Sequence, residues 1–381
     1  MSPRTTRRRL LQSVAALSGA AGCAAPTGRG SREGPPVPIA WESELGDASV
    51  PVPGEFLYVG SPTGVVGVDH GDLLALDPED GERTWGVRTR DSTTQPTLAG
   101  DTVYAGTSRG RVLALDAATG QKRWSHSFEG TYRVEWPVGV QASPVLAGGT
   151  LVATGTTYRH GATVHRVVGL EPATGERRWH RELPAAVSTP SAVAGELACL
   201  ADAGGRLRAL GPDGRRRWRR EFDGRLYAPT VHRGTLYVGC GDEHLYALDP
   251  ASGERRWRVA ARNAVDALAV HDGTVYAGGD DYRVQAVAAT TGERLWRTEL
   301  GNVVTSVAGV RDALVVHVGG SRDGIVTGPT RLVELDATTG ECRRRVSIND
   351  KAGWIAAVEG AVYLGREFDL WRLGGEWSAD A

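Results

Sequence analysis

A short segment that ends in tryptophan recurs along most of this chain, and this repeat limits what the chain can fold into. The first copy, LLALDPEDGERTW, ends at Trp85, and related copies end at Trp124, Trp179, Trp218, Trp257 and Trp296. A seventh copy, LVELDATTGECRRR, has Arg344 at the tryptophan position. Successive tryptophans are 39, 55, 39, 39 and 39 residues apart. This period is typical of a four-stranded unit repeated around an axis, and it argues against a globular α/β enzyme.

One period can be divided into four expected strands. Residues 96–99 form strand A, 102–107 strand B, 111–116 strand C and 122–128 strand D. Apolar residues dominate 111–116, and the Thr-Gly pair that follows supplies the turn before strand D. Glycine is abundant, with 51 of 381 residues, as expected for many tight turns between short strands.

The number of B strands gives the number of units. A Tyr-x-Gly pattern marks five of them, at Tyr58, Tyr104, Tyr237, Tyr276 and Tyr363, and Leu151, Leu197 and Leu314 mark three more. Residues 39–45 stand alone before the first unit, so we expect them to pair with residues 368–373 of the last one. Such pairing would close the ring and remove two exposed edges. The sequence therefore predicts an all-β fold over residues 39–377: an eight-bladed β-propeller of four-stranded blades, closed by the N-terminal strand.

The repeated pattern A-L-D-x-x-T-G-E-x-x-W, as in LYALDPASGERRW, carries a family resemblance. It resembles the pyrroloquinoline-quinone (PQQ) repeat, which is shared by quinoprotein dehydrogenases and by BamB-like lipoproteins of outer-membrane barrel assembly. The resemblance covers residues 39–377. It implies that the repeat tryptophans dock between neighbouring blades, a structural role for Trp85, Trp124, Trp179, Trp218, Trp257 and Trp296. By the same comparison, Arg344 should weaken one junction between blades.

The N-terminal segment has the pattern of an export signal. A basic start with Arg7 and Arg8 precedes a short apolar stretch, and the arginine motif resembles a twin-arginine signal. The following Ala20-Ala21-Gly22-Cys23 resembles a lipobox, with Cys23 as the lipidated residue. We expect a signal peptide over residues 1–22, a flexible tether over 23–38 and a short tail at 378–381. The chain would then be exported and lipid-anchored at the outer face of the cytoplasmic membrane. The alternative is ordinary cleavage near Ala21 with an incidental Cys23.

Charge and motif spacing give little support to other functions. The net charge is −1, so no global field attracts nucleic acid, and we expect no nucleic-acid partner. A quinoprotein would need PQQ, a catalytic Asp and Ca²⁺ bound by six to eight oxygens. The acidic runs 242–243 and 280–281 lie where strand B turns into strand C, a common place for Asp to bind turn amides. We therefore expect no catalytic residue, metal site or cofactor. PQQ with Ca²⁺ belongs only to the alternative of an alcohol or sugar dehydrogenase.

Departures from the 39-residue period predict the binding face. Insertions fall at residues 128–141, 157–166 and 321–331, all in D–A or B–C connections, which emerge on one face of a propeller. Because insertions of a repeat protein often form its binding face, we expect an envelope or cell-surface protein partner there. The candidate contact residues are Tyr132, Arg133, Trp136, Tyr158 and Arg159, since Tyr, Trp and Arg dominate binding hot spots. The favoured function is a non-enzymatic, membrane-tethered monomeric scaffold for protein interaction or envelope assembly. Besides the dehydrogenase, a glycan-binding module with Tyr132, Trp136 and Tyr158 as stacking platforms stays an alternative.

Overall fold

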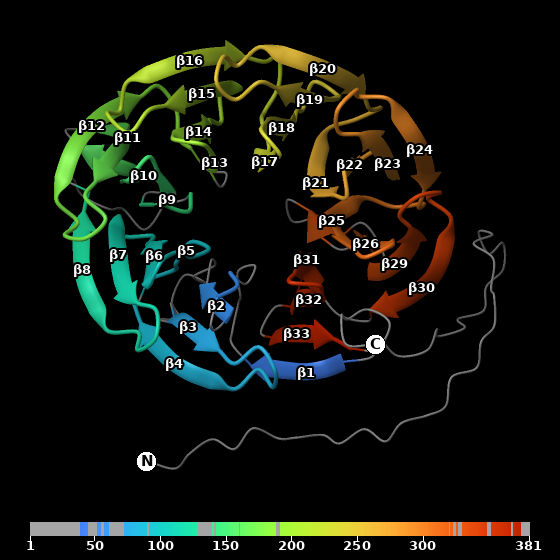
Figure 1. Cartoon of the computed structure of the whole chain (residues 1–381), viewed down its shortest axis with the longest axis horizontal. Helices are drawn as coiled ribbons and strands as arrows, with labels where there is room; N and C mark the ends of the chain where they lie inside the picture. The colour runs from blue at the N-terminus through green and yellow to red at the C-terminus, as the bar shows by residue number, and fades with distance from the viewer. Residues whose placement is uncertain are drawn as a thin grey trace.

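The computed structural model of this protein is a ring of β-sheets around a central axis (Figure 1). It describes residues 39–44, 52–54, 57–60, 72–89, 91–128, 139–140, 142–159, 161–187, 191–319, 321–322, 325–326, 330–348, 352–366 and 369–374. All regular elements among these residues are strands, which confirms the all-β prediction.

Each blade is an antiparallel sheet whose strands run from the inside of the ring (A) to the outside (D). Blade one contains β2 (Leu57–Gly60), β3 (Asp72–Leu76) and β4 (Arg83–Arg88), with Val52 bridged to Tyr58 at the position of strand A. Blade two contains β5 (Thr97–Ala99), β6 (Thr102–Gly106), β7 (Arg111–Asp116) and β8 (Lys122–Ser127), close to the predicted bounds. Blade three contains β9 (Val145–Ala147), β10 (Thr150–Arg159), β11 (Ala162–Leu170) and β12 (Arg177–Leu183). Blade four contains β13 (Ala192–Ala194), β14 (Leu197–Ala201), β15 (Arg206–Leu210) and β16 (Arg216–Glu221).

The second half of the ring follows the same order. Blade five contains β17 (Thr230–His232), β18 (Thr235–Gly239), β19 (His244–Leu248) and β20 (Arg255–Ala260). Blade six contains β21 (Val265–His271), β22 (Thr274–Gly279), β23 (Arg283–Ala288) and β24 (Arg294–Glu299). Blade seven contains β25 (Val304–Val310), β26 (Ala313–Val318), β29 (Thr330–Asp336) and β30 (Cys342–Ile348), with a separate hairpin of β27 (Ser321–Arg322) and β28 (Ile325–Val326). Blade eight contains β31 (Ala352–Val358), β32 (Ala361–Arg366), β33 (Asp369–Leu373) and β1 (Ile39–Glu44).

The ring is closed by its first strand, as predicted. β1 pairs antiparallel with β33, with Glu42 opposite Trp371, so the outermost strand of blade eight comes from the other end of the sequence. Figure 1 shows β1 on the outer circle between β4 and β30, with β33 on its inner side. Closure of this kind protects the edge of β33, which would otherwise expose unpaired backbone groups. The eight-bladed β-propeller is therefore confirmed.

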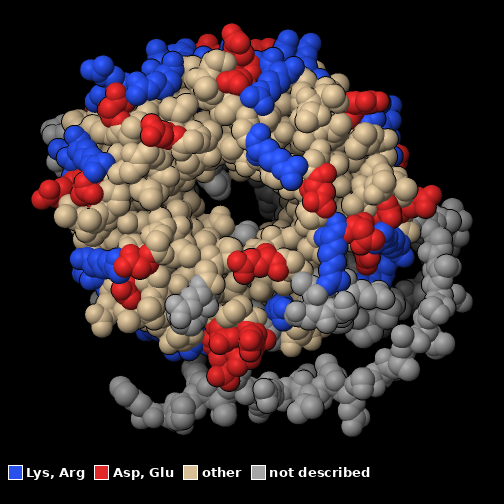
Figure 2. Space-filling view, in the orientation of Figure 1, with Lys and Arg blue, Asp and Glu red and all other residues tan. Residues whose placement is uncertain are grey.

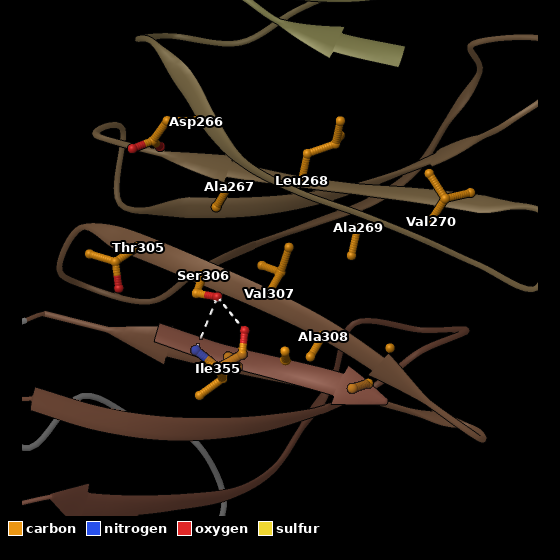
Figure 3. Close-up of a pocket in the computed structure, with 13 residues that line it drawn as sticks. Asp266, Ala267, Leu268, Ala269, Val270, Thr305, Ser306, Val307, Ala308 and Ile355 are labelled. Carbon is orange, nitrogen blue, oxygen red and sulfur yellow. Dashed lines mark hydrogen bonds between the residues drawn. The ribbon is translucent and has the colours of Figure 1, made fainter. Parts of the chain in front are cut away.

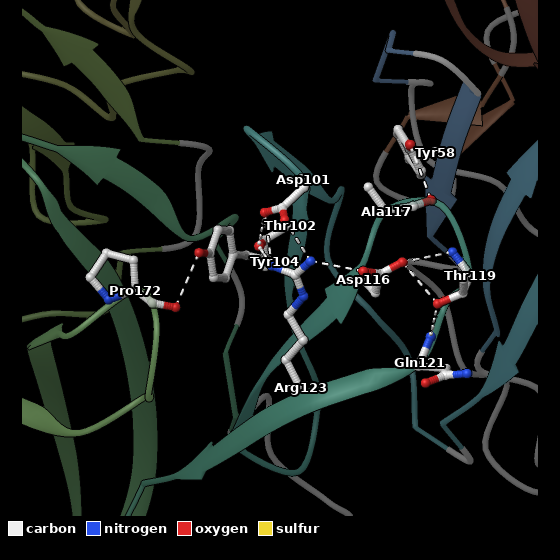
Figure 4. Close-up of polar contacts among 10 residues, drawn as sticks. All are labelled: Tyr58, Asp101, Thr102, Tyr104, Asp116, Ala117, Thr119, Gln121, Arg123 and Pro172. Carbon is white, nitrogen blue, oxygen red and sulfur yellow. Dashed lines mark hydrogen bonds and ion pairs between the residues drawn. The ribbon is translucent and has the colours of Figure 1, made fainter.

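Neighbouring blades are joined by a repeated hydrogen-bonded contact. The indole Nε1 of Trp85 donates to the carbonyl oxygen of Ala117 in the next blade at 2.9 Å, and the hydroxyl of Tyr58 donates to the same oxygen at 3.2 Å. Figure 4 shows this contact of Tyr58 and the equivalent bond from Tyr104 to Pro172. The other five repeat tryptophans donate to carbonyl oxygens at the matching position of the next blade, namely Pro172, Pro212, Pro250, Ala289 and Ala337. The tryptophan period thus corresponds to one contact repeated around the ring.

An ion-pair motif holds the C–D turns in shape. Arg123 contacts Asp101 at 2.7 Å and Asp116 at 2.8 Å, while Asp116 also accepts a hydrogen bond from the backbone amide of Thr119 (Figure 4). The hydrogen bond from Arg123 holds the pKa of the Asp101 carboxyl at about 2, below its ordinary value. Corresponding pairs join Arg256 to Asp249 and Arg343 to Asp336. The repeated aspartate at the end of strand C and the repeated arginine at the start of strand D are therefore ion-pair partners in these blades.

Blade seven departs from this pattern in two paired positions. In the other copies, the repeat tryptophan lies opposite a small residue of strand C, as Trp296 lies opposite Ala286. In blade seven the two positions are Arg344 and Glu334, which form an ion pair at 3.2 Å. The backbone register also places Trp41 at the repeat-tryptophan position of blade eight, which was not among the predicted docking residues. Trp41 lies opposite Arg372 of strand C, as Trp85 lies opposite Ala75 in blade one.

Candidate functional site

The connections between strands B and C form hairpins in the two blades with insertions there. In blade three, β10 and β11 stay paired from Leu151 and Leu170 as far as Arg159 and Ala162. This insertion, expected from the sequence to be an extended connection, continues the two strands as a hairpin. A hydrogen bond of 2.9 Å between Thr156 Oγ1 and His165 Nδ1 links the two sides of this hairpin. Burial lowers the pKa of His165.

Blade seven carries the second hairpin. Ser321 pairs with Val326 and Arg322 with Ile325, in a small sheet separate from the main blade. Blades three and seven lie on opposite sides of the ring, as the positions of β10 and β26 in Figure 1 show. Both hairpins lie between strands B and C. The geometry therefore provides two projections on one face, on either side of the channel.

The predicted contact residues fall into two groups. Tyr158 and Arg159 lie at the end of β10, with Tyr158 opposite Thr163 in the hairpin. Tyr132, Arg133 and Trp136 lie outside the described residues. The end of their D–A connection is described: Gly139 pairs with Thr156 of β10, and the amide of Val140 donates to the carbonyl of Thr107. This segment therefore meets the base of the blade-three hairpin.

Buried ion pairs support the same face. Asp202 follows strand B of blade four, and its carboxylate contacts the guanidinium of Arg208 at 2.5 Å. Both side chains are almost fully buried, and burial lowers the pKa of Arg208 against the opposing effect of Asp202. In blade two, the buried Asp91 contacts Arg111 at 2.5 Å. The sequence analysis did not single out Arg208; its place among apolar residues of the strand (Leu207, Ala209 and Leu210) could have indicated a buried arginine, but its partner depends on the fold. These pairs join strand C to the B–C connection of blade four and to the D–A connection before blade two.

The channel wall differs between the two halves of the ring. The A strands of blades two to five have three residues each, whereas those of blades six, seven and eight have seven. Each long strand contains a β-bulge at the same place, with Asp266, Thr305 and Gly353 as the extra residues. Bulges redirect side chains and are frequent beside functional sites. The sequence analysis did not detect these bulges.

The three long strands border a cavity of about 360 Å³ (Figure 3). Asp266 and Thr305 lie at one end of it, and small apolar residues such as Ala267 and Ala308 form most of the remaining lining. The hydroxyl of Thr305 lies 2.5 Å from the Nδ1 atom of His317, which belongs to the neighbouring strand β26. Burial lowers the pKa of His317 to about 4. This imidazole is therefore neutral at ordinary pH.

The lining of this cavity does not fit the quinone cofactor. PQQ carries several carboxylates, which require cationic or hydrogen-donating partners, but the described lining contains no Arg or Lys. Asp266 is its one carboxylate, whereas Ca²⁺ requires six to eight oxygens. Within the described part of the chain, no group of three His, Cys, Asp or Glu side chains has metal-binding geometry. The described cavity is therefore not a quinoprotein site.

Charge on the visible face is mixed in sign. Figure 2 shows Lys and Arg next to Asp and Glu around the ring, with an opening at its centre bordered mainly by uncharged residues. Ion pairs are also frequent among the described residues, as in Arg283–Glu299 and Arg206–Glu221. This face therefore has no single-sign field.

Comparison with known proteins identifies similar folds. The family model described as "outer membrane protein assembly factor BamB" matches residues 38–198 and 203–362. Among solved structures, BamB from Moraxella catarrhalis has a TM-score of 0.66 at 18% identity, over 90% of this chain and 98% of that one. The computationally designed protein Ika8 has a TM-score of 0.67 at 14% identity, over 88% and 99% of the two chains. The quinohemoprotein alcohol dehydrogenase of Comamonas testosteroni has a TM-score of 0.61 at 14% identity, over 89% and 76%.

At these identities the structural matches show the shared fold alone. No curated protein matches the sequence. Among the described residues, none belongs to a helix long and apolar enough to cross a membrane.

Proposed function

We propose that this chain, which belongs to the family of BamB-like β-propellers, is a non-enzymatic scaffold that binds a protein of the cell envelope. The observation that carries the proposal is the pair of hairpins on one face, in blades three and seven. A protein partner that spans the channel mouth would contact both projections at once. The matching family is described as an outer membrane protein assembly factor, which supports a role in an envelope complex.

The architecture suits binding without catalysis. Blades one to six are each fixed to the next by the tryptophan contact, and buried ion pairs such as Asp202–Arg208 hold the start of strand C. A rigid ring of this kind presents its hairpins in fixed positions, which lowers the entropic cost of binding. Tyr158 at the end of β10 offers an aromatic contact of the type that is frequent in binding hot spots.

We further propose that the scaffold is exported and attached to the membrane surface. Residues 1–22 would serve as a twin-arginine signal peptide read at Arg7 and Arg8, Cys23 would carry the lipid, and residues 23–38 would act as the tether. The anchor would place the ring at the outer face of the cytoplasmic membrane. One acyl group gives only marginal membrane binding, so the proposal includes more than one acyl chain at Cys23.

The test is site-specific photo-crosslinking in whole cells. A benzophenone side chain replaces Tyr158 in one variant and Thr119, in a C–D turn of the opposite face, in the control. We expect a discrete crosslinked species from position 158 and none from position 119. Shortening the blade-three hairpin beyond Thr156 and His165 should remove contact with the partner while leaving the melting temperature nearly unchanged. Crosslinking only from position 119 would place the partner on the C–D face and overturn the proposal.

A second measurement separates the scaffold from the enzymatic alternative. The purified chain is mixed with PQQ and Ca²⁺, and quinone absorbance and dye-linked oxidation of alcohols and sugars are followed. We expect no turnover, because the described cavity lining lacks cationic partners for the quinone. Turnover that requires both PQQ and Ca²⁺ would replace the scaffold function by that of a quinoprotein dehydrogenase. Retention on a glycan column would instead support the glycan-binding alternative.

A further inference from the structure

Charged pairs join strands C and D near the B–C corner of four blades, and in blade two the arginine at this position, Arg111, contacts Asp91 instead. In blade six, Arg283 lies opposite Glu299 with 2.9 Å between their charged groups. In blade four, Arg206 lies opposite Glu221 at 3.3 Å. Blade three has Arg166 opposite Glu182 at 4.0 Å, and blade one reverses the charges with Asp72 opposite Arg88 at 3.9 Å. An arginine at this position is thus normally accompanied by a carboxylate.

Blade seven keeps the arginine and lacks the carboxylate. Arg331 occupies the strand C position, and Ser347 lies opposite it. Arg345 lies opposite Val333, so it shares a sheet face with Arg331 because alternate residues of a strand point to the same side. Among the described residues, neither arginine forms an ion pair, and the nearby acids are already engaged: Glu334 with Arg344 and Asp336 with Arg343.

The two guanidinium groups are also partly removed from water. The Nε atom of Arg345 is buried and has no hydrogen-bond partner. Burial and the charge of Arg331 both lower the pKa of Arg345. A buried donor without an acceptor costs free energy, and so does the approach of two like charges. An anion between the two side chains would relieve both costs.

We propose that Arg331, Arg345 and Ser347 form a binding site for a phosphate-type oxyanion. Two guanidinium groups offer directional donors that match oxyanion geometry, and the serine hydroxyl adds a third. The ion stands in the place that the carboxylate of Glu299 takes in blade six. The phosphate group is either a free ion or part of an anionic lipid headgroup. This site does not depend on the proposed scaffold function.

The decisive variant restores the missing carboxylate. Ser347→Glu should pair internally with Arg331, as in blade six, and exclude the ion. Titration of the full chain with inorganic phosphate, against chloride at equal ionic strength, should raise the melting temperature of the native protein. Calorimetry should then show phosphate binding weakened about tenfold or more by Ser347→Glu, while this variant melts higher than the native protein in the absence of phosphate.

Controls and further variants make the outcome decisive. Arg294→Gln removes an exposed arginine of blade six and should leave phosphate binding unchanged. Arg345→Gln should weaken it about tenfold and serves if Ser347→Glu fails to fold. The native chain could bind phosphatidylglycerol vesicles but not inorganic phosphate. If Arg345→Gln abolished this vesicle binding, the site would be assigned to a lipid headgroup. Equal phosphate responses of the native chain, Ser347→Glu and Arg345→Gln would overturn the site, as would a native response no larger than that to chloride.

Discussion

The contact between blades can be tested by adding one methyl group to a C–D turn. Gly253 of blade five has a φ of +73°, and a Cβ atom there would lie 2.6 Å from Cδ2 of Trp218 in blade four. The ring of Trp218 cannot simply move away, because its Nε1 donates to the carbonyl of Pro250 at 2.8 Å. Gly234, in the A–B turn of blade five, has a similar φ of +69° but open space around its Cα. Gly253→Ala and Gly234→Ala therefore form a matched pair.

The two substitutions share one cost and differ in the other. A residue with a Cβ in the left-handed region costs about 1–2 kcal/mol, and this applies to both variants. Overpacking of a well-filled contact costs a further ~1–3 kcal/mol, which applies to Gly253→Ala alone. The free energy of unfolding should therefore fall by about 1–2 kcal/mol for Gly234→Ala and by about 2–5 kcal/mol for Gly253→Ala.

Urea unfolding followed by tryptophan fluorescence measures this difference, provided that the slope of the transition is unchanged. A double-mutant cycle removes the clash: in a Trp218→Ala background, Gly253→Ala should cost only the backbone strain. Equal losses for Gly253→Ala and Gly234→Ala in the native background would refute the reasoning, because the ring contact would then contribute nothing.

Four further predictions concern pH, blade seven, closure and anchoring. His317 has a folded-state pKa of about 4, below the ordinary 6.5, so the free energy of unfolding of the native chain should fall by about 3 kcal/mol between pH 6.5 and pH 4. His317→Leu should remove this pH dependence, which thermal unfolding across that range would measure. Glu334→Ala should lower the free energy of unfolding in urea by about 1–3 kcal/mol because it leaves Arg344 without its carboxylate, and adding Arg344→Trp should not recover the loss. Deletion of residues 1–46 should cause aggregation in size-exclusion chromatography, whereas deletion of residues 1–38 should not; a soluble, equally stable longer truncation would contradict closure by β1. Cys23→Ser should shift the protein from the membrane fraction to the medium in a fractionation blot, and unchanged retention would mean that no lipid at Cys23 holds it.

Much of the fold could be predicted because it is encoded in local repeats. The tryptophan period marked the outer strands, and the strands predicted for blade two differ from the observed ones by a single residue at three ends. The closing strand was also predictable, because residues 39–45 had no local partner. These features depend on the order of residues along the chain.

Features that depend on cross-strand register could not be predicted in the same way. The insertion at residues 157–166 continues β10 and β11, because consecutive residues on its two sides pair across the hairpin. Asp202 and Arg208 become partners only when strands B and C are aligned, and the bulges at Asp266 and Thr305 arise from the pairing of A with B. Three of the five candidate contact residues lie outside the described part of the chain, so the binding face stays a prediction.

The closure of the ring also explains why one repeat lacks its tryptophan. In the six junctions from blade one to blade seven, the indole donates to a carbonyl in the C–D turn of the next blade, as Trp296 donates to Ala337. Blade eight has no such turn, because its strand C ends at Leu373 and its strand D begins at Ile39, at opposite ends of the sequence. A tryptophan in blade seven would therefore lose the acceptor that fixes it, and a buried indole N–H without an acceptor costs free energy. Arg344 instead forms an ion pair with Glu334 of its own blade, at 3.2 Å. The exchange of Trp and Ala for Arg and Glu thus occurs at the one junction whose next blade has no continuous C–D turn.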